Sequence, residues 1–315
     1  MIPVPEILRA RDVLAGIAVR TPLVRLDIEA DAEIWLKLEL LQPVRSFKIR
    51  GAGNAVLQAT DEELASGVLT ASAGNMAQGV AYAARLRGVP ATIVVPEHAP
   101  QTKIDAIERY GGRVIKVPYD EWWQTLVSGT YEGVNGLFVH PVADDRVMAG
   151  NGTIGLELLE QLAAFDAVVV PYGGGGLLTG IASAVKPERP EVQFFAAEPE
   201  TGAPVAATLA AGGEPAGVDY TPSFVDGAGS RELIPAVWEH ASQILSDAYA
   251  VPLTEAAAAI RVLAERARVI AEGAGALPVA AALSGRVPGK RIVCIVSGGN
   301  IDLSVLTRIL QGETP

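Results

Sequence analysis

The sequence predicts an α/β protein built on parallel, doubly wound sheets. Short apolar runs of strand length alternate with longer helical patterns along the 315 residues, and glycine-rich or polar loops follow several of the runs. Strands that alternate with helices favour parallel sheets covered on both faces. Half of the residues are apolar and 19% are charged, so the chain can bury the core of two domains or of one large domain.

Six apolar runs have the length and composition of strands. They cover residues 35–39, 91–95, 113–117, 167–170, 192–196 and 291–296. Helical patterns lie between these runs, at residues 75–86, 101–110, 153–164 and 254–270. The alanine-rich residues 204–211 predict a short surface helix or loop, because two glycines follow them.

Composition and charge argue against several classes of partner. The 25 basic and 36 acidic residues give a net charge of −11, which repels nucleic acid and anionic membrane surfaces. The apolar, charge-free stretch 167–185 approaches spanning length, but it contains Pro171 and a run of four glycines, which a bilayer helix tolerates badly. Charged residues interrupt the first twelve positions, so no signal peptide is expected there. A single cysteine, Cys294, fits a reducing compartment, and we expect a cytoplasmic protein.

The strongest local signal is a glycine run between an apolar strand and an apolar helix. Ligands of parallel sheets bind at such strand-to-helix loops, and converging N–H groups at a helix start suit a phosphate. No Gly-Lys-Ser/Thr follows the run, and the dinucleotide pattern is not met either. A nicotinamide cofactor stays open as an alternative because Glu198, at the end of a later strand, could bind a ribose. The loop consists of Gly173, Gly174, Gly175, Gly176 and Leu177.

Three other loops carry reactive or polar groups at predicted element ends. Lys48 follows Phe47 before a helix, and apolar neighbours favour the neutral, nucleophilic amine. Ser297 follows the last strand. A third loop suits a carboxylate or serves as an ordinary helix cap, and it consists of Ser72, Ala73, Gly74 and Asn75. A phosphate loop, a lysine amine and a hydroxyl for a ring nitrogen are together what pyridoxal phosphate requires.

The chain resembles the threonine/serine dehydratase branch of the fold-type II pyridoxal-phosphate enzymes, which is related to serine racemase. Five motifs carry the resemblance and occur in the order of that family. They are Ser-Phe-Lys-Ile-Arg-Gly-Ala at 46–52, Ser-Ala-Gly-Asn at 72–75, the glycine loop at 173–177, Glu-Gly-Ala-Gly-Ala at 272–276 and Ser-Gly-Gly-Asn at 297–300. The set covers nearly the whole chain.

The resemblance implies a role for each motif. Lys48 would hold pyridoxal 5'-phosphate through a Schiff base and act as the catalytic base, and the glycine loop would bind the phosphate. Phe47 would pack on the cofactor ring, Asn75 would bond its hydroxyl oxygen, Ser297 would face its pyridine nitrogen, and Glu272 would lie nearby. The substrate carboxylate would be held by Ser72, Ala73, Gly74 and Asn75.

The resemblance also implies a fold and an assembly. The fold would be the tryptophan synthase β-like one, with two open parallel α/β domains and the cofactor between them. Residues 1–60 and 142–315 would form the large domain and residues 61–141 the small one. Members of the family often dimerise, so we expect a homodimer that acts on a small amino acid.

The implied function is β-elimination, in which L-threonine or L-serine is dehydrated and deaminated to 2-oxobutyrate or pyruvate and ammonia. A 3-hydroxyaspartate dehydratase is an alternative, since Arg45 could meet an anionic group. Serine racemase is disfavoured because racemases have a serine where this chain has Ala73. The match around Lys48 disfavours a β-replacement synthase. A cofactor- or nucleotide-binding protein without catalysis would have no use for Lys48.

No metal is expected. Glu198 aligns with the first carboxylate of the cation site in serine-racemase-like members, but the companion acidic position is Pro204. One carboxylate cannot build a hard-cation site alone. The three histidines, His98, His140 and His240, have no metal-ligand spacing.

Overall fold

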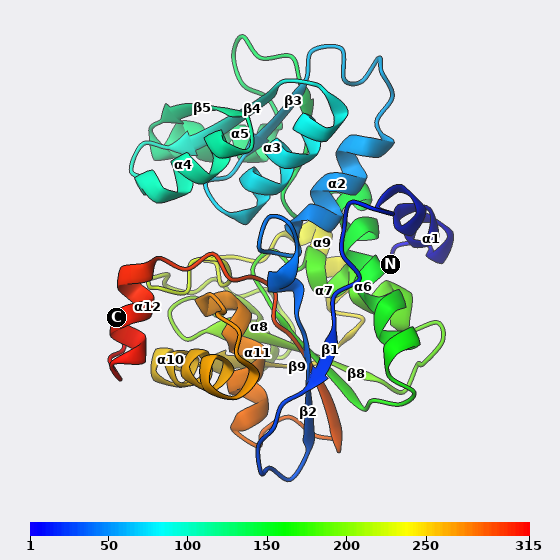
Figure 1. The fold of residues 1–315 in the computed structure, drawn as a ribbon, viewed down its shortest axis with the longest axis vertical. Coiled ribbons are helices and arrows are strands. Elements are labelled where there is room, and N and C mark those ends of the chain that lie inside the picture. The colour runs from blue at the N-terminus through cyan, green and yellow to red at the C-terminus, as the bar shows by residue number, and fades with distance from the viewer.

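The computed structural model describes residues 1–315, which form two separate parallel sheets (Figure 1). The larger sheet has six strands in the order β1-β2-β10-β7-β8-β9, and only β1 runs antiparallel to its neighbour. These strands are β1 (Leu23–Arg25), β2 (Glu33–Lys37), β10 (Arg291–Ile295), β7 (Ala167–Pro171), β8 (Gln193–Pro199) and β9 (Leu245–Val251). The smaller sheet is parallel throughout, in the order β5 (Gly112–Val117), β4 (Ala91–Pro96), β3 (Val68–Ala71) and β6 (Leu137–Phe138).

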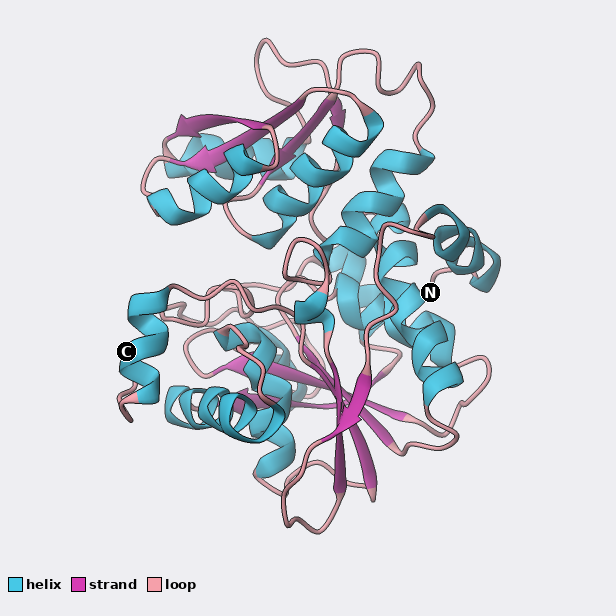
Figure 2. Cartoon of the chain, in the orientation of Figure 1, coloured by secondary structure: helices cyan, strands magenta, loops and turns pink.

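Twelve α-helices connect and cover these strands (Figure 2). In chain order they are α1 (Val4–Val13), α2 (Lys48–Gln58), α3 (Asn75–Arg87), α4 (Gln101–Arg109), α5 (Tyr119–Ser128), α6 (Asp145–Gln161), α7 (Gly176–Val185), α8 (Pro204–Ala210), α9 (Pro235–Ala241), α10 (Leu253–Val262), α11 (Gly273–Leu283) and α12 (Leu303–Leu310). A 3-10 turn, η1 (Glu39–Leu41), and a π-helical turn, η2 (Leu263–Ala267), complete the structure. None of the helices combines the length and the hydropathy that crossing a bilayer requires.

Side-chain alternation along the strands covers both faces of the larger sheet. In β7, Val169 packs into one hydrophobic cluster, whereas Val168 and Val170 pack into another on the opposite face. The first cluster is completed by residues of α10, α11 and α12, and the second by residues of α6, α7 and α9. A third cluster joins α2, α3 and α4 to the smaller sheet. On the other face of the smaller sheet, Leu69 and Val94 pack with Trp122 of α5. The two sheets therefore have separate cores, and both have helices on each side.

The predicted parallel α/β class is confirmed, and all six predicted strands are found within two or three residues of their predicted ends. The helix predicted at 153–164 begins eight residues earlier, because Asp144 caps it by accepting hydrogen bonds from Arg146 N and Val147 N. The helix predicted at 254–270 is too long. Its α-helical part ends at Val262, and a π-helical turn leads to Arg268 at φ 57°.

Four strands were missed, and each lacks a strong local pattern. β1, β3 and β6 have only two to four residues. β9 contains polar and small residues that are mostly exposed or half-buried. Pairing with a neighbour, which is not visible in the local sequence, makes these segments strands. The weak pattern at 204–211 is a helix, α8.

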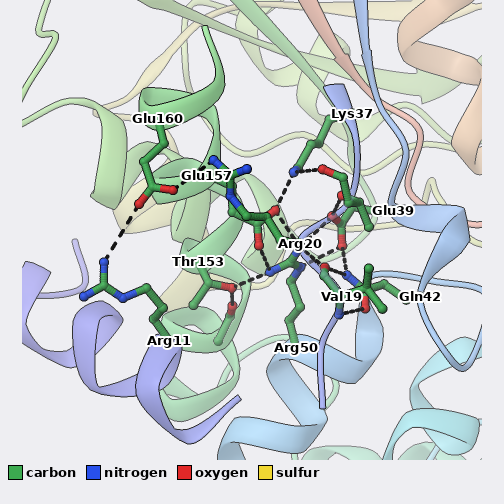
Figure 3. Close-up of polar contacts among 12 residues, drawn as sticks. Arg11, Val19, Arg20, Lys37, Glu39, Gln42, Arg50, Thr153, Glu157 and Glu160 are labelled. Atoms are coloured by element: carbon green, nitrogen blue, oxygen red, sulfur yellow. Dashed lines mark hydrogen bonds and ion pairs between the residues drawn. The ribbon is translucent and has the colours of Figure 1, made fainter. Parts of the chain in front are cut away.

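A buried ionic cluster holds α2 against three other segments (Figure 3). Arg50 is 1% exposed, and every nitrogen of its guanidinium has an acceptor. Its Nε donates to Glu39 at 2.7 Å, and its Nη1 donates to Glu157 of α6 at 2.7 Å. Lys37 of β2 also donates to Glu157 and to Thr21 O, the latter at 2.8 Å. Burial disfavours the charged forms of both groups, but their mutual attraction and hydrogen bonds outweigh it, so the pKa of Arg50 is raised and that of Glu39 is lowered.

We predict that Arg50→Ala lowers the free energy of unfolding by about 3–5 kcal/mol, because it leaves two carboxylates without their buried partner. Urea denaturation measures this loss. The control is Arg20→Ala, which removes the exposed pair of Arg20 with Glu160 at 3.1 Å and should cost no more than ~1 kcal/mol. Equal losses in the two variants would show that the buried cluster has no special weight.

Candidate active site

Lys48 is the first residue of α2 and lies beside the end of β10. Phe47 N donates to Ser297 O at 2.9 Å, and Ser46 forms an isolated β-bridge with Gly298. These backbone contacts attach the lysine loop to the serine loop, although the two are about 250 residues apart in sequence. Two of the sequence-predicted site segments are therefore in direct contact.

The amine of Lys48 is half-buried and points at the chain segment that leads into α6. Its Nζ donates to Pro141 O at 2.9 Å and lies 5.1 Å from the centre of the Phe47 ring. Burial lowers the pKa of Lys48 to about 8, with the charge of Glu272 opposing the shift. At pH 8 about half of the amines are therefore neutral, whereas an ordinary lysine is almost fully protonated. This is the state that a base or nucleophile needs.

The glycine loop connects β7 to α7, as the sequence predicted. The backbone N–H groups of residues 173–175 find no acceptor in the protein. The hydrogen-bond ladder of α7 starts only at Thr179 N, which donates to Gly175 O at 3.0 Å, so the first-turn N–H groups are also free. A row of free donors at the positive end of a helix suits a phosphate.

Close packing explains why three positions of this loop are glycine. A Cβ on Gly174 would lie 2.6 Å from Val142 Cγ2, and one on Gly176 would lie 2.6 Å from Val142 O. Gly175 has φ +86°, which disfavours any residue with a side chain. The segment containing Pro141 and Val142 therefore touches both Lys48 and the glycine loop.

The loop at 72–75 is the one that we expect to bind a carboxylate. It contacts residues next to the larger sheet through Asn75, the first residue of α3. Asn75 Nδ2 donates to Glu272 Oε1 at 2.8 Å, and Asn75 Oδ1 accepts from Asn300 Nδ2 at 2.7 Å. Asn300 N donates to Glu272 Oε2 at 3.1 Å. Burial raises the pKa of Glu272 to about 8 despite these donors. Three residues from separate motifs thus form one network between the two sheets.

The remaining predicted residues of these loops occupy helix and strand ends. Ser72 Oγ accepts a hydrogen bond from Gly74 N at 3.2 Å, and Ala73, between these two residues in sequence, is half-buried. Ser297 is buried just beyond β10. The structure thus places all five predicted motifs around one region between the sheets.

Sequence reasoning missed Pro141, Val142 and Asn300 as individual site residues. A backbone carbonyl such as that of Pro141 has no signature in a sequence, so no local signal could have found it. Asn300 was visible as the last residue of the Ser-Gly-Gly-Asn motif at 297–300.

Glu198 has a structural partner that the sequence did not indicate. Its carboxylate accepts from Val205 N at 3.1 Å and Ala206 N at 3.0 Å, which caps the start of α8. Burial raises the pKa of Glu198 to about 7.

No group of three histidine, cysteine, aspartate or glutamate side chains is arranged to hold a metal ion. Arg45 has an exposed side chain and a backbone φ of 60°, and Met76 is buried in the core of the smaller sheet.

Comparison with known proteins defines the class. Residues 15–298 match the family described as pyridoxal-phosphate dependent enzyme, and the chain belongs to this family. It is 40% identical over 317 residues to an L-threonine ammonia-lyase of Thermotoga maritima, which covers 99% of this chain and 79% of the relative.

Solved structures agree with this assignment. Maize serine racemase superposes with a TM-score of 0.91 at 33% identity, covering 98% of this chain and 97% of that one. A processed threonine deaminase isoform of Solanum lycopersicum gives 0.87 at 32% identity, covering 98% and 88%. The fold is thus that of the fold-type II enzymes, as the motifs predicted, and the cofactor of the family is pyridoxal phosphate.

The residues of this chain fit that cofactor. A phosphate needs several donors without internal partners, and residues 173–175 with the first turn of α7 provide them. An aldehyde needs an amine that is partly neutral near pH 8, and Lys48 provides it. Both lie against the same short segment around Pro141 and Val142.

We predict that Gly174→Ala raises the dissociation constant for pyridoxal phosphate by roughly 5- to 150-fold. All three side-chain carbons of Val142 lie within 2.8 Å of the added Cβ, so the loop or the valine must shift, and such overpacking costs about 1–3 kcal/mol. Equilibrium titration of the cofactor-free protein measures the constant. Gly217→Ala is the control, because its Cβ would meet only Arg231 O at 3.7 Å. Unchanged affinity in Gly174→Ala would argue against this loop as the phosphate site.

We predict that Glu272→Gln removes part of the pH dependence of stability in the cofactor-free protein. The folded pKa of Glu272 is raised from 4.5 to about 8, so its stabilising contribution is present below pH 4.5 and is lost as the pH rises through 8. Between pH 5 and 8 the wild type should therefore lose stability relative to Glu272→Gln, by at most about 4 kcal/mol. Urea denaturation across this range measures the difference, with the exposed Glu214→Gln as control. Parallel curves for wild type and Glu272→Gln would contradict the raised pKa.

Proposed function

We propose that this chain is an ammonia-lyase that converts L-threonine or L-serine into 2-oxobutyrate or pyruvate and ammonia. The relatives named L-threonine ammonia-lyase, 40% identical over almost the whole chain, support this activity. The observation that carries the proposal is the position of Lys48, whose amine is partly neutral near pH 8 and lies against the segment that also packs on the glycine loop.

Each predicted site residue has a proposed role. Lys48 is the catalytic residue and the attachment point of the cofactor, and residues 173–177 bind its phosphate. Phe47, Asn75, Ser297 and Glu272 surround the cofactor ring. The N–H groups and side chains of residues 72–75 hold the substrate carboxylate, for which the start of α3 is suited.

Proton transfer is the part of the reaction that the chain itself performs. Bound pyridoxal phosphate supplies the electron withdrawal that acidifies the Cα–H of the substrate. The neutral amine of Lys48 accepts this proton, and its hydrogen bond to Pro141 O fixes where the Nζ lies. Loss of the β-hydroxyl as water, followed by hydrolysis, gives the 2-oxo acid and ammonia.

Racemisation is the weaker proposal, although serine racemases share the fold. Inversion at Cα needs a second proton donor on the face opposite the lysine. The position before Gly74 is Ala73, which has no proton to donate. Elimination needs no such group.

We also propose the domain division and the setting that the sequence suggested. Residues 61–141 form the small domain, supported by the separate sheet of β3 to β6, and α2 of the large domain packs against the core of that sheet. Residues 1–60 and 142–315 form the large domain. The functional protein is a homodimer in the cytoplasm, as the family resemblance implies.

We predict that the cofactor-loaded protein releases 2-oxobutyrate from L-threonine, and that Lys48→Ala lowers this rate by roughly 100-fold or more, because a positioned base contributes that much. L-serine and threo-3-hydroxyaspartate are assayed as substrates in parallel. Formation of D-serine from L-serine is measured in the same reactions to detect racemisation. Lys116→Ala, at an exposed lysine of β5, is the control.

Borohydride reduction followed by peptide mass spectrometry should find the pyridoxyl group on Lys48. A group trapped on another lysine would refute the assigned site. Trapping on Lys48 with turnover of 3-hydroxyaspartate alone would refute the proposed substrate and would direct attention to Arg45.

A further inference from the structure

We propose that His140 is a positioning residue, which sets both the amine of Lys48 and the glycine loop through one turn of the chain. The inference rests on the proposed function only in assigning the cofactor to Lys48 and to residues 173–177. Neither the family motifs nor the metal-ligand spacing singled out this histidine.

His140 fixes the turn with its side chain. Its Nδ1 accepts hydrogen bonds from Ala143 N at 2.8 Å and Val142 N at 3.1 Å. Position 141 is proline and has no N–H, so the ring takes up both donors of residues 141–143. An Nδ1 that accepts from two N–H groups carries no proton, so the ring is neutral with its proton on Nε2. Burial and the charge of Lys48 lower the pKa of His140 to about 4, which keeps this state at neutral pH.

The turn lies between two firmly attached ends. On one side, Val139 N donates to Leu69 O at 2.8 Å, and Val139 O accepts from Thr70 Oγ1 at 2.8 Å. On the other, Asp144 caps α6. Residues 140–143 are the stretch in between, and the two bonds to the His140 ring determine its shape.

The shape of this turn sets two contacts of the candidate site. Pro141 O accepts the hydrogen bond from Lys48 Nζ at 2.9 Å. The next residue, Val142, is the one against which Gly174 and Gly176 pack. If the bonds to His140 were lost, the carbonyl and the valine would move together, because they belong to adjacent residues. One side chain thus couples the amine that binds an aldehyde to the loop that binds a phosphate.

Two variants distinguish the effect of the hydrogen-bond acceptor of His140 from the effect of its ring packing. His140→Asn keeps an acceptor at the same distance from Cβ, since Asn Oδ1 can accept from the N–H groups two and three residues ahead. His140→Phe keeps an aromatic ring of similar size, which can still pack edge-to-face on Phe138 as the histidine does at 6.1 Å, but has no acceptor. A positioning role requires the acceptor, whereas a packing role requires the ring.

The experiment uses two readouts that need no substrate. The first is the fraction of Lys48 trapped by borohydride at limiting pyridoxal phosphate. The second is the affinity of the cofactor-free protein for inorganic phosphate, measured by calorimetry, which reports on the glycine loop alone. Thermal unfolding of each variant shows whether it is folded.

We expect His140→Asn to remain within about three-fold of wild type in both readouts. His140→Phe should lose about ten-fold or more in both, while remaining folded, since a lost positioning bond of about 1.4 kcal/mol corresponds to ten-fold. The inference is overturned if Phe matches wild type and Asn does not, or if both variants match wild type. If wild-type protein itself shows no trapping on Lys48, the proposed function fails instead, and the phosphate readout still tests the effect of His140 on the loop.

Discussion

The buried guanidinium of Arg50 is the interaction on which the rest of the site depends. Arginine carries five N–H donors in a rigid plane, and burying them is tolerable only when acceptors surround the plane. Glu39, Glu157, Thr153 and a backbone carbonyl provide those acceptors, and they come from η1, α6 and the N-terminal segment. Because Arg50 lies two residues after Lys48 on α2, the same contacts that satisfy its charge also orient the helix that carries the lysine.

Charge near Lys48 is controlled mainly by burial. The lysine and Glu272 are both shifted toward their neutral forms, and both have pKa values of about 8. The charge of Glu272 opposes the shift of Lys48, so the ionised acid makes the amine harder to deprotonate. The two asparagines bonded to Glu272 connect this balance to α3 and to the loop after β10. The residue that opposes the pKa shift of Lys48 is therefore part of the hydrogen-bond network between the two sheets.

Close backbone packing supplies the second constraint. The segment after β6 lies so near the glycine loop that side chains at 174 and 176 would collide with Val142. This steric contact explains the glycines at 174 and 176 better than backbone flexibility does, because it identifies the positions at which a Cβ would collide with Val142. The free N–H groups of the same loop then follow from the helix geometry of α7, whose first turn has no internal acceptors. Packing and hydrogen bonding thus together leave a row of free N–H donors, which suits a phosphate.

The sequence by itself determined the parallel α/β class, six of the ten strands and the five motifs. These follow from local chemistry, namely side-chain periodicity, the absence of a Cβ in glycine and an amine among apolar neighbours. It could not place the start of α6, the cap that Glu198 provides for α8, or the left-handed backbone of Arg45. Only the tertiary structure decided that Pro141 O receives Lys48 Nζ across 93 residues. Every residue has such a carbonyl, so its partner is set by how the chain folds in space and not by residue type.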